Sequence, residues 1–420
     1  MSSVLHVCGG TTLRGELAIT GSCGAGLALL AACAATTHEV QLSGLPLTRS
    51  IARQADVLRQ FGRTVEQTED GWRVHPGACQ ASLEGPLDLP WSALLFLGPI
   101  LAHRGECCLP LPRPCVGSGP LDPYGKILRA LGATIEMDAG QVRVATHQLQ
   151  GGEVYLDIPH FGATWTAITA ATRARGRTRI IGASRAPELV DAVNLLNRMG
   201  ARIVGAGTEA ITIAGGTSWT GGVHEVIPDR IAGGFYLIAG AATGGEVCVQ
   251  GVISDHLRAL AAKLEETGAE VEMTSDCIRV RGSSRPKPVS LRTGFYPSFP
   301  SLLRPAMCSL LLRSHGTSVI SETVIESGLH HLDELERMGA QITRDGQIAV
   351  IRGGAPLGAA RVRAQDPGSA AALIIAALMA DGTSCIEKAD ELLAWFPAPC
   401  DHLAQLGSEI RWQGKSQAAG

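Results

Sequence analysis

Hydrophobic and polar positions recur along the chain in one order. Residues 153–158 alternate between polar and apolar side chains, which predicts a strand, and residues 163–173 predict a helix. Residues 178–181 predict a second strand, and residues 187–199 an amphipathic helix with one apolar face. This second helix is expected to end at Gly200, because glycine readily closes a helix C-terminus. The local order is therefore strand, helix, strand, helix.

The same order occurs six times. In each segment a helix-like run ends on an apolar or small residue followed by glycine, and successive glycines are 70, 68, 68, 71 and 68 residues apart. Repetition at such a regular spacing indicates repeated structural units. The glycines that mark the six units are Gly62, Gly132, Gly200, Gly268, Gly339 and Gly407.

The first helix of each unit differs from the second. Residues 25–35 and 370–380 are rich in alanine and apolar nearly all round, so these helices should be buried. Six such units predict an α/β architecture with helices packed inside and sheets outside. This arrangement is neither a Rossmann sheet nor an ordinary barrel.

Composition narrows the classes of protein. The chain has 420 residues, enough for two or three domains, with 45% hydrophobic and 18% charged residues and a formal net charge of −3. This balance argues against disorder and against nucleic acid as a partner, which would demand a basic surplus. No apolar run reaches the ~18 residues of a membrane span, and the start of the chain lacks the features of a signal peptide. We therefore expect a cytoplasmic protein with a small-molecule substrate and no membrane partner, whose oligomeric state stays open, a monomer included.

The cysteines and histidines give no metal signature. None of the 12 cysteines forms a C-x-x-C pair, and most lie in apolar runs, so we interpret them as buried reduced thiols. The adjacent His330 and His331 would point in different directions on a helix or a strand. The chain also has no G-x-G-x-x-G after a strand, no P-loop and no G-x-S-x-G elbow. We expect neither a metal ion nor a cofactor.

Several short segments resemble the enolpyruvyl transferases, in particular UDP-N-acetylglucosamine 1-carboxyvinyltransferases. They occur in the family's order over nearly the whole chain, and they are Leu13–Glu16, Thr20–Gly21, Leu97–Pro99, Pro187–Asp191, Pro228–Ile231, Phe299–Pro300, Glu322–Glu326 and Glu334–Ala340. The resemblance implies an inside-out α/β barrel of two domains, each with three repeated βαβαββ-type units. Residues 21–227 would form one domain and residues 1–20 with 228–420 the other, with the active-site cleft between them.

The charged residues of the family's site do not carry over. Enolpyruvyl transfer uses phosphoenolpyruvate, a small polyanion whose binding needs several cations. The family's Lys falls on Cys23 and its neighbouring Asn on Gly24, while the acidic partner of that Lys falls on Ser50. The proton-handling Asp falls on Leu302. The family's arginines fall on Trp91, on or beside Gly119, and on Gly368 and Ala394.

One functional group matches. Cys115 corresponds to the family's loop cysteine, which the resemblance makes a proton donor near the substrate. Arg113-Pro114 stands before it where the family has Gly-Gly, and because proline fixes φ the loop should be stiffer.

Aromatic side chains gather at or near the family's ligand segments: Trp91, Phe161, Trp165, Tyr296, Phe299, Trp395 and Phe396. They would suit a pocket for a neutral or apolar ligand. The alternative is that they fill the space of the lost arginines in a collapsed cleft.

A few polar groups remain in these segments. His160 could act as an acid or base near neutral pH, or serve as a hydrogen-bonded structural residue. Asp229 and Arg230 are expected to form a structural ion pair, and Arg304 could hold an anion. The full set of candidate substrate-binding residues is Cys23, Trp91, Phe161, Trp165, Asp229, Arg230, Tyr296, Leu302, Arg304, His331, Asp366 and Trp395.

Three functions stay open. The first is a repurposed enzyme of specialised metabolism that cyclises or isomerises a neutral or apolar molecule, with Cys115 and His160 as catalytic candidates. The second is carboxyvinyl transfer to an unusual or sugar-nucleotide acceptor. The third is a non-catalytic protein that binds a ligand or a partner.

Overall fold

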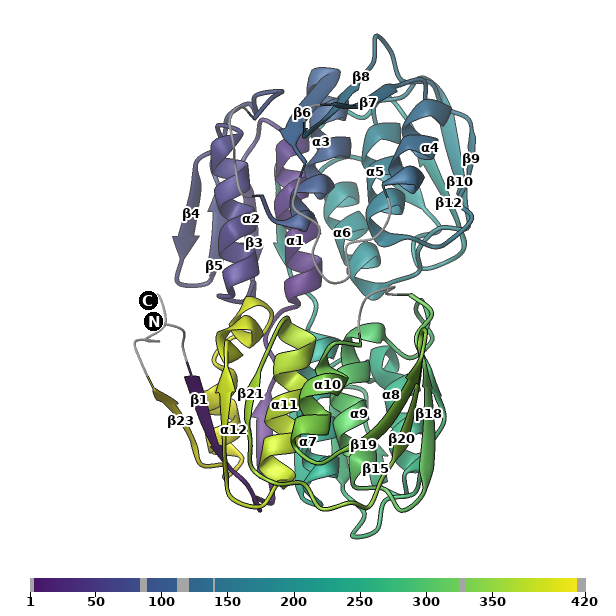
Figure 1. The fold of residues 1–420 in the computed structure, drawn as a ribbon. Coiled ribbons are helices and arrows are strands. Elements are labelled where there is room, and N and C mark those ends of the chain that lie inside the picture. The colour runs from purple at the N-terminus through teal and green to yellow at the C-terminus, as the bar shows by residue number, and fades with distance from the viewer. Residues whose placement is uncertain (1–3, 84–88, 112–120, 139, 325–328, 414–420) are drawn as a thin grey trace. The chain divides into compact units, whose positions relative to one another are not determined.

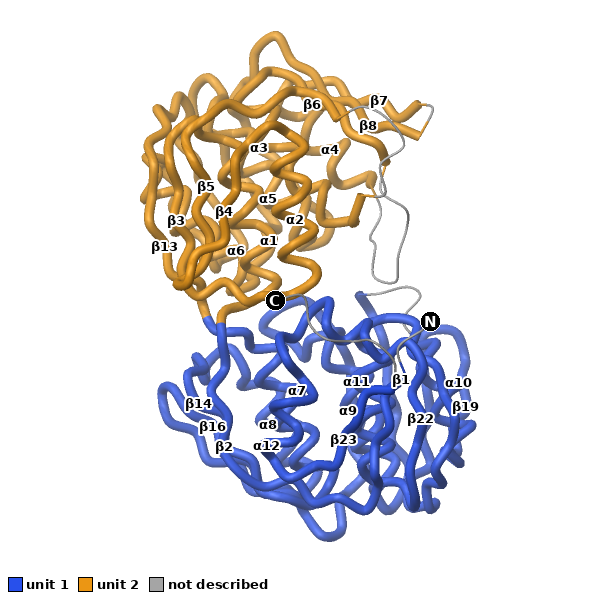
Figure 2. The backbone as a smooth tube through the Cα atoms, turned by 90° about the vertical axis from the view of Figure 1, so that its left-hand side faces the viewer, with its two compact units in different colours: residues 1–20, 228–420 blue, residues 21–227 orange. Residues whose placement is uncertain are grey.

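The computed structural model describes residues 4–83, 89–111, 121–138, 140–324 and 329–413. The chain divides into two compact units, which Figure 2 shows in different colours. Unit 1 comprises residues 1–20 and 228–420, and unit 2 comprises residues 21–227. Within the described ranges no helix has the length and apolar character needed to cross a membrane.

The third repeat has the predicted order of elements. Strand β9 (Glu153–Tyr155) leads through helix α5 (Phe161–Ala171) to β10 (Arg177–Ile181), which lies parallel to β9. Helix α6 (Pro187–Arg198) then leads to the hairpin of β11 (Arg202–Val204) and β12 (Ala210–Ala214), and β12 is antiparallel to β10. Helix α5 begins before the predicted residue 163 because the side chain of His160 caps it. The pattern of hydrophobic positions therefore gives the correct elements and misses only their ends.

Unit 2 contains three such repeats. Its other elements are α1 (Cys23–Ala32), the short helix η1 (Cys33–Ala35), β3 (Val40–Ser43), α2 (Arg49–Gln60), β4 (Val65–Thr68), β5 (Gly71–Val74), the short helix η2 (Trp91–Phe96), α3 (Leu97–Arg104), β6 (Glu106–Pro110), α4 (Asp122–Ala130), β7 (Thr134–Asp138), β8 (Gln141–Ala145) and β13 (Gly222–Glu225).

Unit 1 contains the other three repeats. Its elements are β1 (Val4–Cys8), β2 (Arg14–Ala18), α7 (Arg230–Ala242), β14 (Glu246–Gln250), the short helix η3 (Ser254–Leu257), α8 (Arg258–Glu266), β15 (Glu270–Met273), β16 (Cys277–Arg281), β17 (Leu291–Arg292), the short helix η4 (Ser301–Leu303), α9 (Arg304–Leu312), β18 (Thr317–Ser321), α10 (His331–Arg337), β19 (Gln341–Asp345), β20 (Ile348–Arg352), β21 (Arg361–Arg363), α11 (Pro367–Met379), β22 (Thr383–Glu387), the short helix η5 (Ala389–Ala394), α12 (Pro399–Gln405) and β23 (Ile410–Gln413).

In each unit the first helices of the repeats form the interior, and sheets of three or four strands lie around them (Figure 1). Helices α7, α9 and α11 pack against one another in unit 1, and α3 and α5 do so in unit 2. Almost every residue of these helices is buried, as their apolar sequences predict. The expectation of helices inside and sheets outside is confirmed.

At the two points where the chain passes from one unit to the other, a strand belongs to one unit and the helix that follows it belongs to the other. Strand β2 precedes α1 of unit 2, yet it lies parallel to β14 of unit 1. Strand β13 precedes α7 of unit 1, yet it lies parallel to β3 of unit 2. The N-terminal strand β1 pairs with β22 and β23, which lie near the C-terminus of the chain. It thereby completes the sheet of the sixth repeat, called the sixth sheet below, whose strand order is β21-β22-β1-β23.

The six repeated glycines share one backbone conformation. Gly62, Gly132, Gly200, Gly268, Gly339 and Gly407 have φ between 81° and 103°. A residue with a side chain adopts this left-handed region at a cost, whereas glycine adopts it freely. Each glycine follows the C-cap residue of a helix and turns the chain into the next segment.

Candidate functional site

The candidate residues lie largely at the N-terminal ends of the inner helices. Unit 2 holds Cys23, Trp91, His160, Phe161 and Trp165, and unit 1 holds Asp229, Arg230, Tyr296, Leu302, Arg304, His331, Asp366 and Trp395. Cys115 falls outside the described residues.

In unit 2 a glutamine joins the first turns of two inner elements. The Gln54 amide nitrogen donates to the Leu27 carbonyl oxygen of α1 at 3.0 Å and to the Ser92 carbonyl oxygen of η2 at 3.2 Å. The Ser92 hydroxyl donates back to the Gln54 side-chain oxygen at 2.8 Å. Because Leu27 is one helical turn from Cys23 and Ser92 follows Trp91, these bonds bring the beginnings of α1 and η2 to one end of the unit.

Cys23 occupies the first position of α1 and is fully buried. Its Sγ lies 3.4 Å from the Thr48 hydroxyl, and Thr48 also caps α2 by accepting a hydrogen bond from the Ile51 amide at 3.3 Å. A neutral thiol and a hydroxyl thus stand where the family resemblance places a lysine. A buried charge would need a partner at this position, which a thiol does not.

His160 serves as the N-cap of α5. Its Nδ1 accepts a hydrogen bond from the Ala163 amide at 3.0 Å, and its ring packs edge-on against Tyr124 at 5.5 Å between centroids. Burial lowers the pKa of His160, because the charged imidazolium is poorly solvated there. The position supports the structural role for His160 over an acid–base role, and a neutral ring is what the cap requires.

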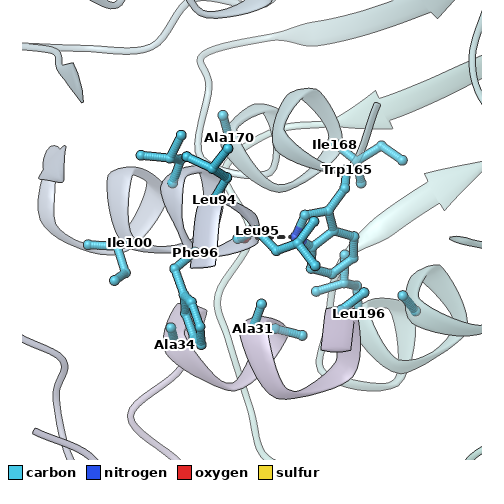
Figure 3. Packing of buried hydrophobic residues seen from close by; sticks show 14 of the residues in the cluster. Ala31, Ala34, Leu94, Leu95, Phe96, Ile100, Trp165, Ile168, Ala170 and Leu196 are labelled. Carbon is cyan, nitrogen blue, oxygen red and sulfur yellow. Dashed lines mark hydrogen bonds between the residues drawn. The ribbon is translucent and has the colours of Figure 1, made fainter. Parts of the chain in front are cut away.

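Trp165 belongs to the hydrophobic core of unit 2. Its side chain is fully buried, and its Nε1 donates to the Leu95 carbonyl oxygen at 2.9 Å (Figure 3). Leu94, Phe96 and Ile168 surround the same region. The expectation that Trp165 lines a ligand pocket is corrected: its one polar atom is already satisfied and its ring has no exposed surface.

Trp91 and Phe161 are half-buried. Each is the first residue of its helix, η2 or α5, and each packs against the core of unit 2. They differ from Trp165 in that part of each ring remains exposed at the end of the unit where these helices begin. Among the described aromatic candidates of unit 2, Trp91 and Phe161 are thus the ones with surface to offer a ligand.

In unit 1 the beginnings of three inner helices meet. A Cβ at Gly368 of α11 would lie 3.0 Å from Pro305 of α9, and one at Gly234 of α7 would lie 2.4 Å from Leu303. These glycines permit the close approach. The approach places Arg230, Leu302 and Asp366, which sit beside these contacts in sequence, at one end of unit 1.

Arg304, the first residue of α9, pairs with Glu322. The two side chains form an ion pair and are 2% and 0% exposed. Glu322 also accepts hydrogen bonds from the Thr293 hydroxyl at 2.7 Å and the Ser301 hydroxyl at 2.9 Å. The expectation that Arg304 could hold an anion is corrected, because a buried carboxylate of the same unit already neutralises it.

Two carboxylates cap inner helices of unit 1. Asp229 accepts from the amides of Ile231 at 2.8 Å and Ala232 at 3.0 Å at the start of α7. Asp366 accepts from the Ser369 amide at 2.8 Å in a capping box at the start of α11. Carboxylates are favoured at these positive helix ends. Asp229 therefore has a capping role beside the ion pair expected for it.

The remaining candidates of unit 1 differ in exposure. The Arg230 guanidinium lies 5.5 Å from the centroid of the half-buried Tyr296 ring. Leu302 is 39% exposed, whereas His331 is buried at the start of α10. Trp395 is partly buried against the core of unit 1. Tyr296, Leu302 and Trp395 are thus candidates with exposed apolar surface in this unit.

Sequence reasoning did not single out two buried charged groups. Glu322 was noted only as part of a matching segment, and Asp191 likewise, although Asp191 Oδ1 lies 2.8 Å from His224 Nε2 with both side chains 3% exposed. Asp191 lies inside an apolar run, which is a signal that could have drawn attention to it, whereas Glu322 stands between Ser321 and Thr323 and has no such signal. Among the described residues no group of three or more His, Cys, Asp or Glu side chains could hold a metal ion.

Comparisons with known proteins agree with this fold. The family model described as EPSP synthase (3-phosphoshikimate 1-carboxyvinyltransferase) matches residues 7–403. Two UDP-N-acetylglucosamine 1-carboxyvinyltransferases of Carboxydothermus hydrogenoformans are similar to the chain. One is 38% identical, covering 91% of each chain, and the other is 41% identical, covering 89% of this chain and 90% of the relative.

Two solved structures share the fold. The enolpyruvyl transferase NikO from Streptomyces tendae has a TM-score of 0.87 at 23% identity, covering 98% of this chain and 99% of that one. EPSP synthase from Acinetobacter baumannii has a TM-score of 0.75 at 17% identity, covering 98% and 100%. The repeated sheets, the buried helices and these matches together show that the chain belongs to the EPSP synthase/enolpyruvyl transferase family.

Proposed function

We propose that this chain is a divergent enolpyruvyl transferase homologue that no longer uses phosphoenolpyruvate. It acts on a neutral or largely apolar small molecule, through a cyclisation or isomerisation that needs orientation more than charge stabilisation. The family fold supplies the scaffold, and the altered residues at the ends of the inner helices define the new chemistry. Half-buried Trp91, Phe161, Tyr296 and Trp395 would supply the apolar contacts.

The observation that carries the proposal is the buried Cys23 against Thr48. Where the family resemblance places a lysine, unit 2 has an uncharged thiol and a hydroxyl. Trp91, Gly368 and Ala394 stand where it places arginines. Each charge-assisted contact to a buried anion contributes about 1.5–3 kcal/mol, so several such losses would remove useful affinity for phosphoenolpyruvate.

One cation that remains in these segments of unit 1, Arg304, is internally neutralised. Arg304 pairs with the buried Glu322, so using Arg304 for an anionic substrate would leave a buried carboxylate without its cation. Such a loss costs several kcal/mol. Arg304 therefore does not compensate for the missing arginines.

A phosphate-release assay tests the proposal. Phosphoenolpyruvate and UDP-N-acetylglucosamine are incubated with this protein and, as a positive control, with the 41% identical Carboxydothermus hydrogenoformans relative. We expect phosphate release at background level from this protein and no heat of phosphoenolpyruvate binding by calorimetry. Release that depends on the sugar nucleotide would overturn the proposal.

Native mass spectrometry of the protein as purified tests the apolar ligand. We expect a bound neutral molecule that is lost in Trp91→Ala and Trp395→Ala but retained in Cys115→Ser. If Cys115→Ser binds the ligand yet converts it more slowly, Cys115 handles a proton in the reaction. Binding without any conversion would favour the non-catalytic alternative.

Carboxyvinyl transfer is the second candidate. It is favoured by the similarity over about nine-tenths of the chain to relatives named UDP-N-acetylglucosamine 1-carboxyvinyltransferases. This function would require cations for phosphoenolpyruvate from outside the positions discussed above. The same phosphate-release assay, repeated with other sugar nucleotides as acceptors, separates the two candidates.

A further inference from the structure

On the outer face of the sixth sheet an imidazole lies between a thiol and a side-chain amide and contacts both. Cys385 Sγ on β22 lies 3.4 Å from His6 Nδ1 on β1, and His6 Nε2 lies 2.7 Å from the Gln413 side-chain oxygen on β23. His6 and Cys385 are directly opposite each other in the antiparallel register. These residues come from both ends of the chain, and the sheet brings them together because β1 lies between β22 and β23.

The amide of Gln413 determines which nitrogen of His6 faces the thiol. A neutral imidazole has one donor and one acceptor nitrogen, and the Gln413 carbonyl oxygen can only accept. Nε2 therefore carries the proton and donates to Gln413, which leaves Nδ1 as an acceptor for the Cys385 thiol proton. This is the arrangement in which a histidine, itself held by a third group, prepares a cysteine as a nucleophile.

Charges around Cys385 favour anionic reagents. Arg361 on β21 lies directly opposite Cys385, and its Nε donates to Glu387 Oε1 at 2.6 Å. Arg411 on β23 lies opposite His6. The side chains of Arg361 and Arg411 project from exposed positions, and Arg363 of β21 lies opposite Glu387 on the same face, so three arginines and the Glu387 carboxylate share this face with the thiol.

Three other thiols among the described residues are poorer nucleophiles. Burial raises the pKa of the Cys33, Cys308 and Cys400 thiols to about 12, which keeps them protonated. Cys385 is half-buried on an outer face. Cys8 is also half-buried on the same face of the same sheet, but its Sγ faces the Thr383 hydroxyl at 3.5 Å. Cys8 is thus a matched thiol beside a hydroxyl in place of an imidazole.

We propose that Cys385 is a thiol modification site that reacts with anionic low-molecular-weight disulfides, with His6 as the proton acceptor. The Cys385 sulfur attacks one sulfur of the disulfide while its proton passes to His6 Nδ1. A mixed disulfide bond forms, the original sulfur–sulfur bond breaks, and the second half leaves as a thiolate that takes up the proton from His6. Cys385 is oxidised and the departing half of the reagent is reduced, so the exchange needs no other oxidant.

Peptide-level mass spectrometry after brief treatment with dithiobis(nitrobenzoic acid), an aromatic dicarboxylate disulfide, tests the site. In the wild-type protein we expect Cys385 to be modified at least about tenfold faster than Cys8. His6→Asn should bring the rate of Cys385 close to that of Cys8 and leave the rate of Cys8 unchanged. Equal rates for Cys385 and Cys8 in the wild type, or an unchanged Cys385 rate in His6→Asn, would overturn the proposal.

A second variant keeps the test decisive if His6→Asn disturbs the sheet. Gln413 is exposed, so Gln413→Met should leave the fold intact and release the imidazole from its fixed tautomer. We expect an intermediate slowing at Cys385 with Cys8 unaffected, and equal slowing of both would contradict a positioning role for Gln413.

The charge preference has its own pair of variants. The wild type should react faster with the dicarboxylate disulfide than with cystamine, a cationic disulfide, at low salt. Arg361→Gln should reduce this ratio, and Glu387→Gln should increase it. A ratio that neither substitution changes would overturn the choice of anionic disulfides as the reagent class.

Discussion

Arg304 and Glu322 form a buried ion pair between the first residue of α9 and the segment that follows β18. The pair fixes the beginning of an inner helix, and hydroxyls of Thr293 and Ser301 add to it. A cation at this end of unit 1 therefore serves the structure. Removing the Arg304 charge should lower the free energy of unfolding more than removing a surface charge does.

Arg304→Met should destabilise unit 1 by about 3–5 kcal/mol, because it leaves the Glu322 carboxylate buried without its cation. Urea unfolding measures the loss. Glu322→Gln in the Arg304→Met background should recover part of it, since the unpaired charge is then gone. The exposed Arg258, which pairs with Asp255, provides the control: Arg258→Met should change the free energy of unfolding by no more than about 0.5 kcal/mol. Equal effects of Arg304→Met and Arg258→Met would contradict the assignment.

Gly98→Ala should destabilise unit 2 by about 1–3 kcal/mol through overpacking. Its Cβ would lie 2.1 Å from the Thr169 hydroxyl and 2.8 Å from the Thr166 carbonyl oxygen, where α3 meets α5. Gly152 has no atom within 4 Å of a built Cβ, so Gly152→Ala should be neutral or stabilising by up to about 1 kcal/mol. Thermal unfolding of the two variants compares them directly, and similar midpoints would show that α3 and α5 pack less closely.

Trp165→Phe should cost about 1–3 kcal/mol of unfolding free energy, because the buried Leu95 carbonyl oxygen loses its donor. The half-buried Trp91 provides the comparison: Trp91→Phe should lower the free energy of unfolding less than Trp165→Phe does. If Trp165→Phe proved neutral in urea unfolding while it abolished ligand binding, the assignment of Trp165 to the core would be wrong.

His160 should make the stability of unit 2 depend on pH. Its pKa is lowered in the folded state from an ordinary value of 6.5, so the unfolded chain binds more protons between the two values. Stability contributed by neutral His160 is therefore complete above about pH 7.5 and is lost as the pH falls below 6.5 toward the folded pKa.

His160→Asn isolates this contribution. Asparagine can still accept the capping hydrogen bond but does not titrate in this range. The difference in unfolding free energy, wild type minus variant, should fall as the pH decreases from about 8 to 5. His103 and His402, whose pKa values burial also lowers, remain in both proteins and cancel in the difference. A difference that stays constant over this range would show that protonation of His160 does not break its capping hydrogen bond.

The sequence by itself determined the repeated plan of the fold. Local chemistry was sufficient, because a glycine suits the left-handed turn after the second helix of each repeat and an apolar alanine-rich helix has to be buried wherever it packs. Matching segments such as Pro187–Asp191 named the family, and the comparisons confirmed it.

Only the tertiary structure decided which residues the ends of the inner helices offer to a ligand. Trp165 and Trp91 look alike as aromatic residues near matching segments, yet one is enclosed by Leu95 and its neighbours and the other keeps exposed surface. The charge of Arg304 is taken by Glu322, 18 residues away, and His6 meets Cys385 across 379 residues. Periodicity reports how a residue faces its own helix or strand, whereas these outcomes depend on which distant strand or helix becomes its neighbour.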